Sequence, residues 1–591
     1  MRPPMVTPLA PRDTPRQTGL PVGGHRRRPV WIASAQGQTM SPSNGTHPLS
    51  WGDTFFLYLE REGQPINIAS CCEFEGKITR QACARFVASK LHLIPRYKQR
   101  AVFQSFNLGL PQWELDPEFD INNHVHEVVL QQLTDGDLKA ETAKVISSIL
   151  DRNHPLWDIT LVRGVKGNRT GIIFRIHHSM ADGVSGVTIM NVLLDASPSP
   201  EKPAPPKARP APARPADSMA ILLDQLLKSY QTFMQGALTA QSEVVNIARE
   251  VLAKATQGRA EDLVHLVPEL GSVAERFPFN QICRGPQQIA WGEIPMDDIK
   301  AIRESLGGTV NDVVLSIITA TVRRYTERHG VDVRGRELRM IVPVNVRGDG
   351  DLRELGNQIS FLPINIPLDV RDPRALLSRI SERIVFLRSV GVPEMVGLFG
   401  TMLSAVPLPV QAVLVPLLTQ LPLSLANMIC TNVPGPQWPL YLLGRKLLRC
   451  YPYVPIGGLL GVNVAILSYN GVAYVGFGGD VFAVPDIERF ENMLRESFEE
   501  LRAAAAQPYT AHSHQEPVRR TVRPRPIPEG PAKSEAAKSR VAKPKMKTIP
   551  LAPPPPKQKR TARKAGSFPA AAAPVSAATG APLQELAKTG D

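Results

Sequence analysis

Two short apolar runs, separated by the turn residues Gly167 and Asn168, constrain the fold of this chain more than any other feature. Residues 159–166 and 170–176 are rich in β-branched side chains and are bounded by turn residues, which is typical of neighbouring strands. The second run ends in a polar loop, and residues 184–195 then carry apolar side chains at roughly helical spacing. This order of strand, strand and helix predicts an α/β fold built on mixed sheets.

The second half of the chain repeats this order of elements without repeating the sequence. Its patterns predict helices at 296–306, 311–329 and 373–389 and strands at 338–346 and 359–366. The remaining expected elements are helices at 53–61, 79–93, 137–150 and 485–504, and strands at 66–76, 123–130, 461–468 and 472–478. The chain is long enough for two packed domains.

Charge is distributed very unevenly along the chain. Residues 1–40 carry a net charge of +5 and residues 507–591 carry +11, so that the total of +14 leaves −2 for residues 41–506. The basic ends are rich in proline and poor in large apolar residues, and cannot build a core. We therefore expect disordered basic segments at 1–46 and 507–591, and a folded core that does not bind nucleic acid.

A third segment of similar composition divides the patterned region. Residues 197–217 are dominated by Pro, Ala and basic residues, which predicts an extended, solvated linker. The expected domains are therefore an N-terminal one at 47–196 and a C-terminal one at 218–506, which opens with a helical connection at 218–265.

Residues 395–444 contain no charged side chain. A bilayer can be crossed by about 20 apolar residues, so this segment is long enough to do so. It is interrupted, however, by prolines and amide side chains, among them Pro407, Pro409, Pro416, Pro422, Gln411, Gln420 and Asn427. We therefore expect a buried or surface-inserting helical hairpin, at the kind of interface where an enzyme would meet apolar substrates.

Neither a disulfide framework nor a metal site is expected. The six cysteines form no CxxC pair, and the adjacent Cys71 and Cys72 are expected on opposite faces of a strand. His124 and His126 share one face of a strand but lack a third ligand. The cysteine usage predicts a reducing, cytosolic compartment, and the N-terminal segment lacks the apolar core of a signal peptide.

The loop after the second apolar run carries the residues best suited to chemistry, in the sequence His177-His178-Ser-Met-Ala-Asp182-Gly183. Adjacent side chains on an extended chain point in opposite directions, so that one histidine can face a reaction centre and the other packs behind it. Imidazole is suited to proton transfer near neutral pH. The structural alternative is a polar turn with core histidines and a capping Asp182. Ser179 lies outside any Gly-x-Ser-x-Gly elbow.

In this context, the loop resembles the active-site signature of CoA-dependent acyltransferases that share the fold of chloramphenicol acetyltransferase. Further stretches resemble the bacterial wax ester synthase / acyl-CoA:diacylglycerol acyltransferase family, and together the likeness covers roughly 47–503. These stretches are LSWGDTFFLYLE at 49–60, HPLWDI at 154–159, NDVVL at 311–315, PVNVR at 343–347, Gly356-Asn357 with Ser360, TNVPGP at 431–436, and residues 451–480. Trp51-Gly52 departs from the Pro-Leu that is more usual in this family.

The resemblance implies two chloramphenicol acetyltransferase-like domains around a central channel. It also implies direct transfer of a long-chain acyl group from acyl-CoA to diacylglycerol or to a long-chain alcohol, without an acyl-enzyme or a cofactor. His178 would be the general base and His177 would support it, while Asp182 would fix the loop through a buried pair with an arginine. Such an enzyme would be cytoplasmic and peripherally bound to the inner membrane or to lipid droplets.

Three further motifs supply residues for substrate binding or for structure: Pro155-Leu156-Trp157, Asn311-Asp312, and Asn432. The first is expected to support the active-site strand, with Trp157 either in the core or lining an acyl channel. Asn311 and Asp312 begin a helix, where they either cap it or place an amide that polarises the reacting carbonyl. Asn432 precedes a sharp loop that either crosses between domains or is a simple turn.

Two other functions fit parts of this pattern. Acyltransferases that use a carrier-protein thioester share HHxxxDG, but are expected to lack the contexts around Asn311-Asp312 and 431–436. A catalytically silent lipid-surface scaffold could use the basic tail, and the intact set of His177, His178 and Asp182 weighs against it. The preferred acceptor, the acyl chain length and the choice of Met1 or Met40 as start remain open.

Overall fold

The computed structural model describes residues 47–104, 107, 109–199, 272–345, 359–393, 396, 406, 408–418 and 424–507. The basic segment at 1–46, the helices expected at 218–265 and nearly all of the linker and the C-terminal tail lie outside these residues. So do Gly356-Asn357 and part of the charge-free segment.

The first six-stranded sheet holds the hairpin that the sequence predicted. Its order is β12-β13-β2-β7-β6-β5, and all neighbours are antiparallel except β5 and β6. The strands are β2 (Asn67–Glu75), β5 (Val125–Gln132), β6 (Trp157–Lys166), β7 (Arg169–His177), β12 (Tyr441–Leu442) and β13 (Arg445–Tyr453). The helices of this half are α2 (Trp51–Leu59), α3 (Arg80–Lys90), α4 (Asp135–Ile146) and α5 (Gly183–Leu193), and a small sheet of β1 (His47–Pro48), β4 (Gln112–Leu115) and β3 (Gln99–Val102) lies beside them.

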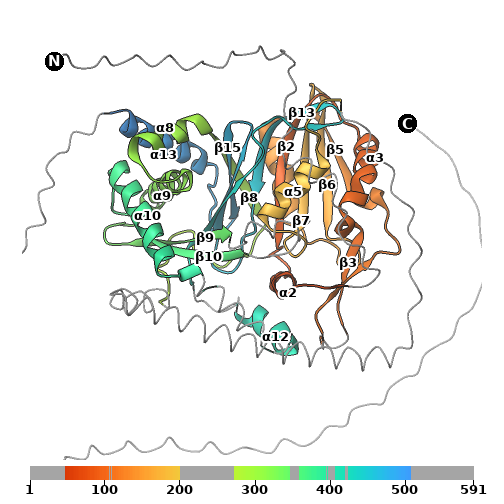
Figure 1. Cartoon of the computed structure of the whole chain (residues 1–591), viewed down its shortest axis with the longest axis horizontal. Coiled ribbons are helices and arrows are strands. Elements are labelled where there is room, and N and C mark those ends of the chain that lie inside the picture. The colour runs from red at the N-terminus through yellow and green to blue at the C-terminus, as the bar shows by residue number, and fades with distance from the viewer. Residues whose placement is uncertain are drawn as a thin grey trace, which may run out of the picture. The chain divides into compact units, whose positions relative to one another are not determined.

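The second six-stranded sheet is also mixed. Its order is β10-β9-β11-β14-β15-β8, with β11 parallel to both of its neighbours. The strands are β8 (Gln287–Pro295), β9 (Glu337–Asn345), β10 (Ile359–Pro367), β11 (Met428–Pro434), β14 (Val462–Tyr469) and β15 (Val472–Asp480). The helices α8 (Met296–Leu306), α9 (Val310–Arg328), α10 (Pro373–Ser389) and α13 (Arg489–Ala506) gather on one side of this sheet (Figure 1). The predicted α/β class with mixed sheets is confirmed.

A strand from the C-terminal half of the protein, β13, extends the first sheet beyond β2. β13 pairs antiparallel with β2, so that Cys450 lies opposite Cys72 and their buried sulfurs are 2.8 Å apart. Next to this pair, the guanidinium of Arg449 binds the buried carboxylate of Glu73 at 2.5 Å. The boundaries predicted at 47–196 and 218–506 stay a prediction, but residues on both sides of the linker build one sheet.

Two helices begin earlier than the spacing of apolar residues predicted, because side chains cap their first turns. α2 begins two residues before the predicted start because the hydroxyl of Ser50 accepts the amide of Asp53 at 3.0 Å. α4 likewise begins early, at a capping box formed by Thr134 and Asp137. Strands β8, β11 and β13 of the two large sheets, at 287–295, 428–434 and 445–453, were not predicted from the sequence.

The charge-free segment contributes the short helix α12 (Leu408–Leu418) to the described part of the chain. Among the described residues, no single helix is both long and apolar enough to cross a bilayer. α8 and α9, bent by 100° relative to each other, pass that test of length and composition only as a pair. The helical hairpin expected at 395–444 is wrong for the C-terminal part of that segment, because residues 428–434 form β11, which pairs with β9 and β14, and residues 441–442 form β12. Insertion of the remaining part into a surface stays a prediction.

Candidate active site

The two histidines lie at the end of β7: His177 is its last residue and His178 follows it. The amide of His177 donates to the carbonyl of Leu156, and the amide of His178 donates to the carbonyl of Ile66, both at 2.9 Å. The chain is therefore fixed from both sides, and the two side chains have different surroundings. His177 is fully buried, whereas His178 is partly exposed.

The buried ring of His177 is held by hydrogen bonds at one nitrogen and faces a carboxylate with the other. Its Nδ1 accepts the backbone amide of Ser179 at 3.0 Å and lies 2.7 Å from the Ser179 hydroxyl. Because Nδ1 accepts from a backbone N–H, the ring proton is assigned to Nε2, which lies 3.5 Å from a carboxylate oxygen of Glu60. This distance is at the outer limit for a hydrogen bond.

Glu60, which was not among the predicted site residues, lies beside His177. Its carboxylate accepts the amide of Ile66 at 3.1 Å and pairs with Arg152 at 3.1 Å. Burial raises the pKa of Glu60, but its interactions with His177, the Ile66 amide and Arg152 outweigh burial and lower the pKa to about 2. Since the carbonyl of Ile66 binds the amide of His178, Glu60 supports both histidines. The only sequence signal was its place at the end of the stretch at 49–60.

Helix α2 also supplies the ring that packs on His178. Phe56 is stacked on the imidazole, with ring centroids 3.9 Å apart and an angle of 19° between the planes. Phe55 contacts Phe56 edge-on at 5.9 Å. Stacking restricts the orientation of the His178 ring, which a positioned base requires.

Ser179 lies beside His177 and Glu60 in an arrangement that superficially resembles a Ser-His-acid triad. The serine is only 1% exposed, and both its amide and its hydroxyl face Nδ1 of the same ring. A nucleophile must reach its substrate, so the contacts of Ser179 are those of a residue that shapes the loop.

Asp182 caps α5. Its carboxylate accepts the amide of Ser185 at 2.7 Å, and its side chain is buried. Asp182 therefore has the helix-capping role that was given as the structural alternative for the HHxxxDG loop. The predicted arginine partner of Asp182 stays a prediction; the arginine of the adjoining strand, Arg175, binds Asp158.

Gly183 brings α5 against β11 of the second sheet. A Cβ atom at this position would lie 3.0 Å from Cγ2 of Val433, which is closer than ordinary van der Waals contact. The neighbouring Asn432 donates from its side-chain amide to Oδ1 of Asn311 at 3.3 Å. The end of the HHxxxDG loop and two candidate residues of the C-terminal half are therefore brought together.

Replacing Gly183 by alanine is expected to lower stability by about 1 kcal/mol, because Val433 must move to admit the methyl group. Denaturant unfolding of Gly183→Ala, Val433→Ala and the double variant measures this effect. The loss of unfolding free energy in the double variant is expected to be smaller than the sum of the losses in the two single variants. Additive losses would mean that the two side chains do not compete for space.

Asp312 caps a helix, which is the structural alternative given for it above. It forms a reciprocal capping box with Thr309 at the start of α9, and its carboxylate also accepts the hydroxyl of Ser381 at 2.9 Å. Gly308, just before the cap, has a φ of +80°, a conformation that glycine adopts without strain. Asn311, in contrast, is half-buried and binds Asn432.

Pro155, Leu156 and Trp157 support the active-site strand from within the core. All three are buried, and the carbonyl of Leu156 holds the amide of His177. Trp157 is stacked between Tyr97 and His124, with both centroids 4.5 Å away, and its indole N–H donates to the carbonyl of Tyr97. These contacts support the core interpretation of Trp157.

His124 and His126 differ in environment. The first is buried, and its Nδ1 lies 2.8 Å from the carbonyl of Trp157; burial lowers its pKa. The second is exposed. Within the described ranges, no group of three or more His, Cys, Asp or Glu side chains could hold a metal ion.

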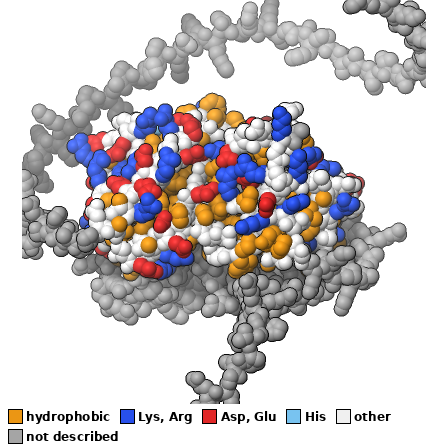
Figure 2. Space-filling view, turned by 90° about the horizontal axis from the view of Figure 1, so that it is seen from above, with side chains coloured by type: hydrophobic (Ala, Val, Ile, Leu, Met, Phe, Trp, Pro, Cys, Tyr) orange, Lys and Arg blue, Asp and Glu red, His pale blue; other side chains and the backbone are white. Residues whose placement is uncertain are grey.

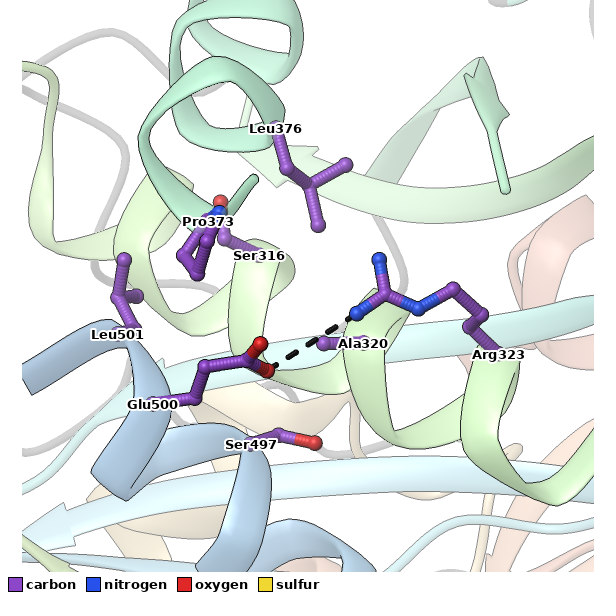
Figure 3. Close-up of a pocket in the computed structure, with 8 residues that line it drawn as sticks. All are labelled: Ser316, Ala320, Arg323, Pro373, Leu376, Ser497, Glu500 and Leu501. Carbon is purple, nitrogen blue, oxygen red and sulfur yellow. Dashed lines mark ion pairs between the residues drawn. The ribbon is translucent and has the colours of Figure 1, made fainter. Parts of the chain in front are cut away.

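A small pocket lies away from these residues, between α9, α10 and α13 (Figure 3). Arg323 and Glu500 approach each other to 3.9 Å on its wall. None of the predicted site residues lines this pocket, and the channel expected between the two halves stays a prediction.

Acidic and basic side chains are interleaved on the face shown in Figure 2. This pattern agrees with the nearly neutral charge of residues 41–506. A continuous basic surface, the usual footprint of a nucleic-acid-binding protein, is not visible on that face.

Comparison with known proteins gives consistent results along the chain. Residues 49–314 match the wax ester synthase/diacylglycerol acyltransferase catalytic domain, and residues 355–502 match the C-terminal domain of the same family. Two Mycobacterium tuberculosis proteins named as probable diacylglycerol O-acyltransferases are each 28% identical. The first aligns over 443 residues, which are 73% of this chain and 91% of the relative. The second aligns over 466 residues, which are 76% of this chain and 98% of the relative. The fold is similar to that of the wax ester synthase/diacylglycerol acyltransferase of Marinobacter aquaeolei VT8, with a TM-score of 0.53 and 23% sequence identity. This structural match covers 78% of this chain and 100% of the Marinobacter chain.

Proposed function

The chain belongs to the wax ester synthase/diacylglycerol acyltransferase family, and from this membership we propose that it moves a long-chain acyl group from acyl-CoA to diacylglycerol. Long-chain alcohols are the second acceptor class. Related proteins of M. tuberculosis that cover most of this chain are named for the first of these acceptors.

The observation that carries the proposal is the contrast between the two histidines. His177 is enclosed by Ser179 and Glu60, whereas His178 is partly exposed and has its ring plane set by Phe56. In the proposed reaction, His178 takes the proton of the acceptor hydroxyl as its oxygen bonds to the thioester carbonyl carbon. The carbon–sulfur bond then breaks, and the imidazolium returns the proton to the departing CoA thiolate. No acyl-enzyme is needed.

Asn311 is the proposed donor to the carbonyl oxygen. Its Oδ1 accepts a hydrogen bond from Asn432, which leaves its own NH₂ group as the donating end. Amide donors that face a developing oxyanion stabilise the transition state. Asn432 would then be a positioning residue that sets the orientation of the Asn311 amide.

We place the enzyme in the cytoplasm, peripherally bound to the inner membrane or to lipid droplets. Diacylglycerol and its product are too apolar to diffuse freely through water, so an enzyme that uses them must work at a lipid surface. The net charge of +11 in residues 507–591 favours binding to anionic lipid, with about 1 kcal/mol gained per basic residue near the surface.

Incubation of the purified protein with radiolabelled palmitoyl-CoA and a panel of acceptors tests the reaction. Triacylglycerol is expected from diacylglycerol and wax ester from hexadecanol, each dependent on acyl-CoA. A parallel arm supplies palmitoyl-acyl carrier protein as donor. Transfer from the carrier protein but not from CoA would replace the proposed donor, and no labelled ester from either donor would exclude the proposed reaction.

A further inference from the structure

The apolar helix α12 has the reverse of the polarity expected for a helix that faces water. Its polar side chain, Gln411, points inward and is 1% exposed, together with the buried Val415. Val410, Val413 and Leu417 are 51%, 69% and 54% exposed. These three positions are spaced at i, i+3 and i+7, so they form one stripe along the outer side of the helix.

The inward polar group of α12 has a specific partner. The indole N–H of Trp51 donates to the side-chain oxygen of Gln411 at 2.7 Å, and the amide of Gln411 donates to the carbonyl of Val406 at 2.5 Å. Trp51 is also the residue at which this chain departs from the Pro-Leu more usual in the motif at 49–60. The departure therefore supplies the hydrogen bond that joins α12 to α2.

A row of aromatic rings continues from this hydrogen bond to the active site. Trp51 contacts Phe55 at 5.3 Å, Phe55 contacts Phe56 at 5.9 Å, and Phe56 is stacked on His178 at 3.9 Å. All three aromatic residues lie on α2, next to α12 (Figure 1). The exposed apolar stripe is thus connected through one helix to the candidate base.

We propose that the stripe formed by Val410, Val413 and Leu417 is the surface by which the enzyme docks on lipid, and that Trp51 is a positioning residue that holds this surface next to the active site. The proposal rests on the proposed function, which requires a lipid-borne acceptor. The occupant is an acyl-chain surface because the stripe is wholly apolar and because residues 395–444 offer no charge to a polar partner.

Sedimentation of the full-length protein with vesicles of phosphatidylcholine and diacylglycerol tests the docking surface. The assay is run at about 1 M salt, where the Debye length is about 3 Å and attraction by the basic tail is screened. Val413→Asp is expected to lower vesicle partitioning at least about tenfold, because it places a charge where an apolar side chain is buried in lipid. Val385→Asp on α10 is the matched control, since Val385 is also 69% exposed, and is expected to bind as the unaltered protein does.

Trp51→Phe tests the link to the active site. The variant keeps an aromatic ring but removes the N–H that binds Gln411, so that α12 is less firmly held. The ratio of turnover on vesicle-borne diacylglycerol to turnover on a short soluble alcohol is expected to fall severalfold. Trp113→Phe is the control, because it makes the same exchange in a fully buried tryptophan whose indole N–H has no hydrogen-bond partner among the described residues.

The outcomes separate the two proposals. Equal vesicle binding by Val413→Asp and the unaltered protein, with acyl transfer retained, would overturn the docking surface alone. A change in oligomeric state in Val413→Asp without a change in vesicle binding would assign the stripe to a second copy of the chain, and would also overturn it. Loss of vesicle binding by Val413→Asp in a protein that transfers no acyl group to any acceptor would support the docking surface and overturn the proposed function.

Discussion

Replacement of His178 by alanine is expected to lower acyl transfer by about 10²–10⁴-fold, the usual contribution of a positioned general base. The fold is expected to survive, because the side chain is partly exposed and its backbone amide still binds the carbonyl of Ile66. Steady-state turnover of palmitoyl-CoA with diacylglycerol measures the effect, and the melting temperature checks the fold.

His126→Ala is the control for His178→Ala, since His126 lies exposed on β5 of the same sheet. It is expected to keep full turnover. His177→Ala is expected to lose more thermal stability than His178→Ala, because His177 is fully buried and holds Ser179. If His178→Ala turned over acyl-CoA at the unaltered rate, the assignment of the base would be wrong.

Replacement of Glu60 by glutamine is expected to cost on the order of 3 kcal/mol of unfolding free energy at pH 7. The amide would present an NH₂ group where the carboxylate now receives Arg152 and faces Nε2 of His177. Wherever the NH₂ group of the glutamine points, at Arg152 or at Nε2 of His177, two donors would face each other and the neighbour's donor would lose its acceptor. Urea unfolding measures the loss, and Glu62→Gln, an exposed neighbour, is the control expected to be neutral.

The pH dependence of stability provides a second test of Glu60. Its pKa is lowered to about 2 in the fold, so ionised Glu60 contributes stability above its ordinary pKa of 4.5. That contribution is lost as the pH falls from 4.5 toward 2. The Glu60→Gln variant lacks the titrating group, so the difference in stability between the two proteins is expected to shrink over this range. A constant difference would mean that the carboxylate does not titrate as its surroundings require.

Local patterns predicted the elements that carry the histidines. The hairpin at 157–177 and helix α5 follow from alternation, from the turn at Gly167 and from helical spacing, all of which are short-range properties. The opposite environments of His177 and His178 follow from the geometry of a strand. These features required no knowledge of the rest of the fold.

Long-range contacts could not be predicted in the same way. Nothing in residues 445–453 indicates that they pair with β2, because the partner of Cys450 lies 378 positions earlier. Glu60 was missed for a similar reason: at the end of α2 its local partner is a backbone amide, that of Ile66, and its charged partners Arg152 and His177 lie far along the chain. Asn311 and Asn432 were identified separately, and only the fold shows that they meet.

The pairing of β13 with β2 has a consequence for how the protein emerges from the ribosome. The catalytic family match ends at residue 314, well before β13, so a nascent chain that has completed this region still exposes one edge of β2. Translation at about 5–20 residues per second leaves that edge open for roughly 7–28 seconds more, until residue 453 has been added. An unpaired edge is a template for aggregation. A fragment that ends at residue 314 is accordingly expected to be insoluble, and the first sheet closes only when residues 445–453 have been synthesised.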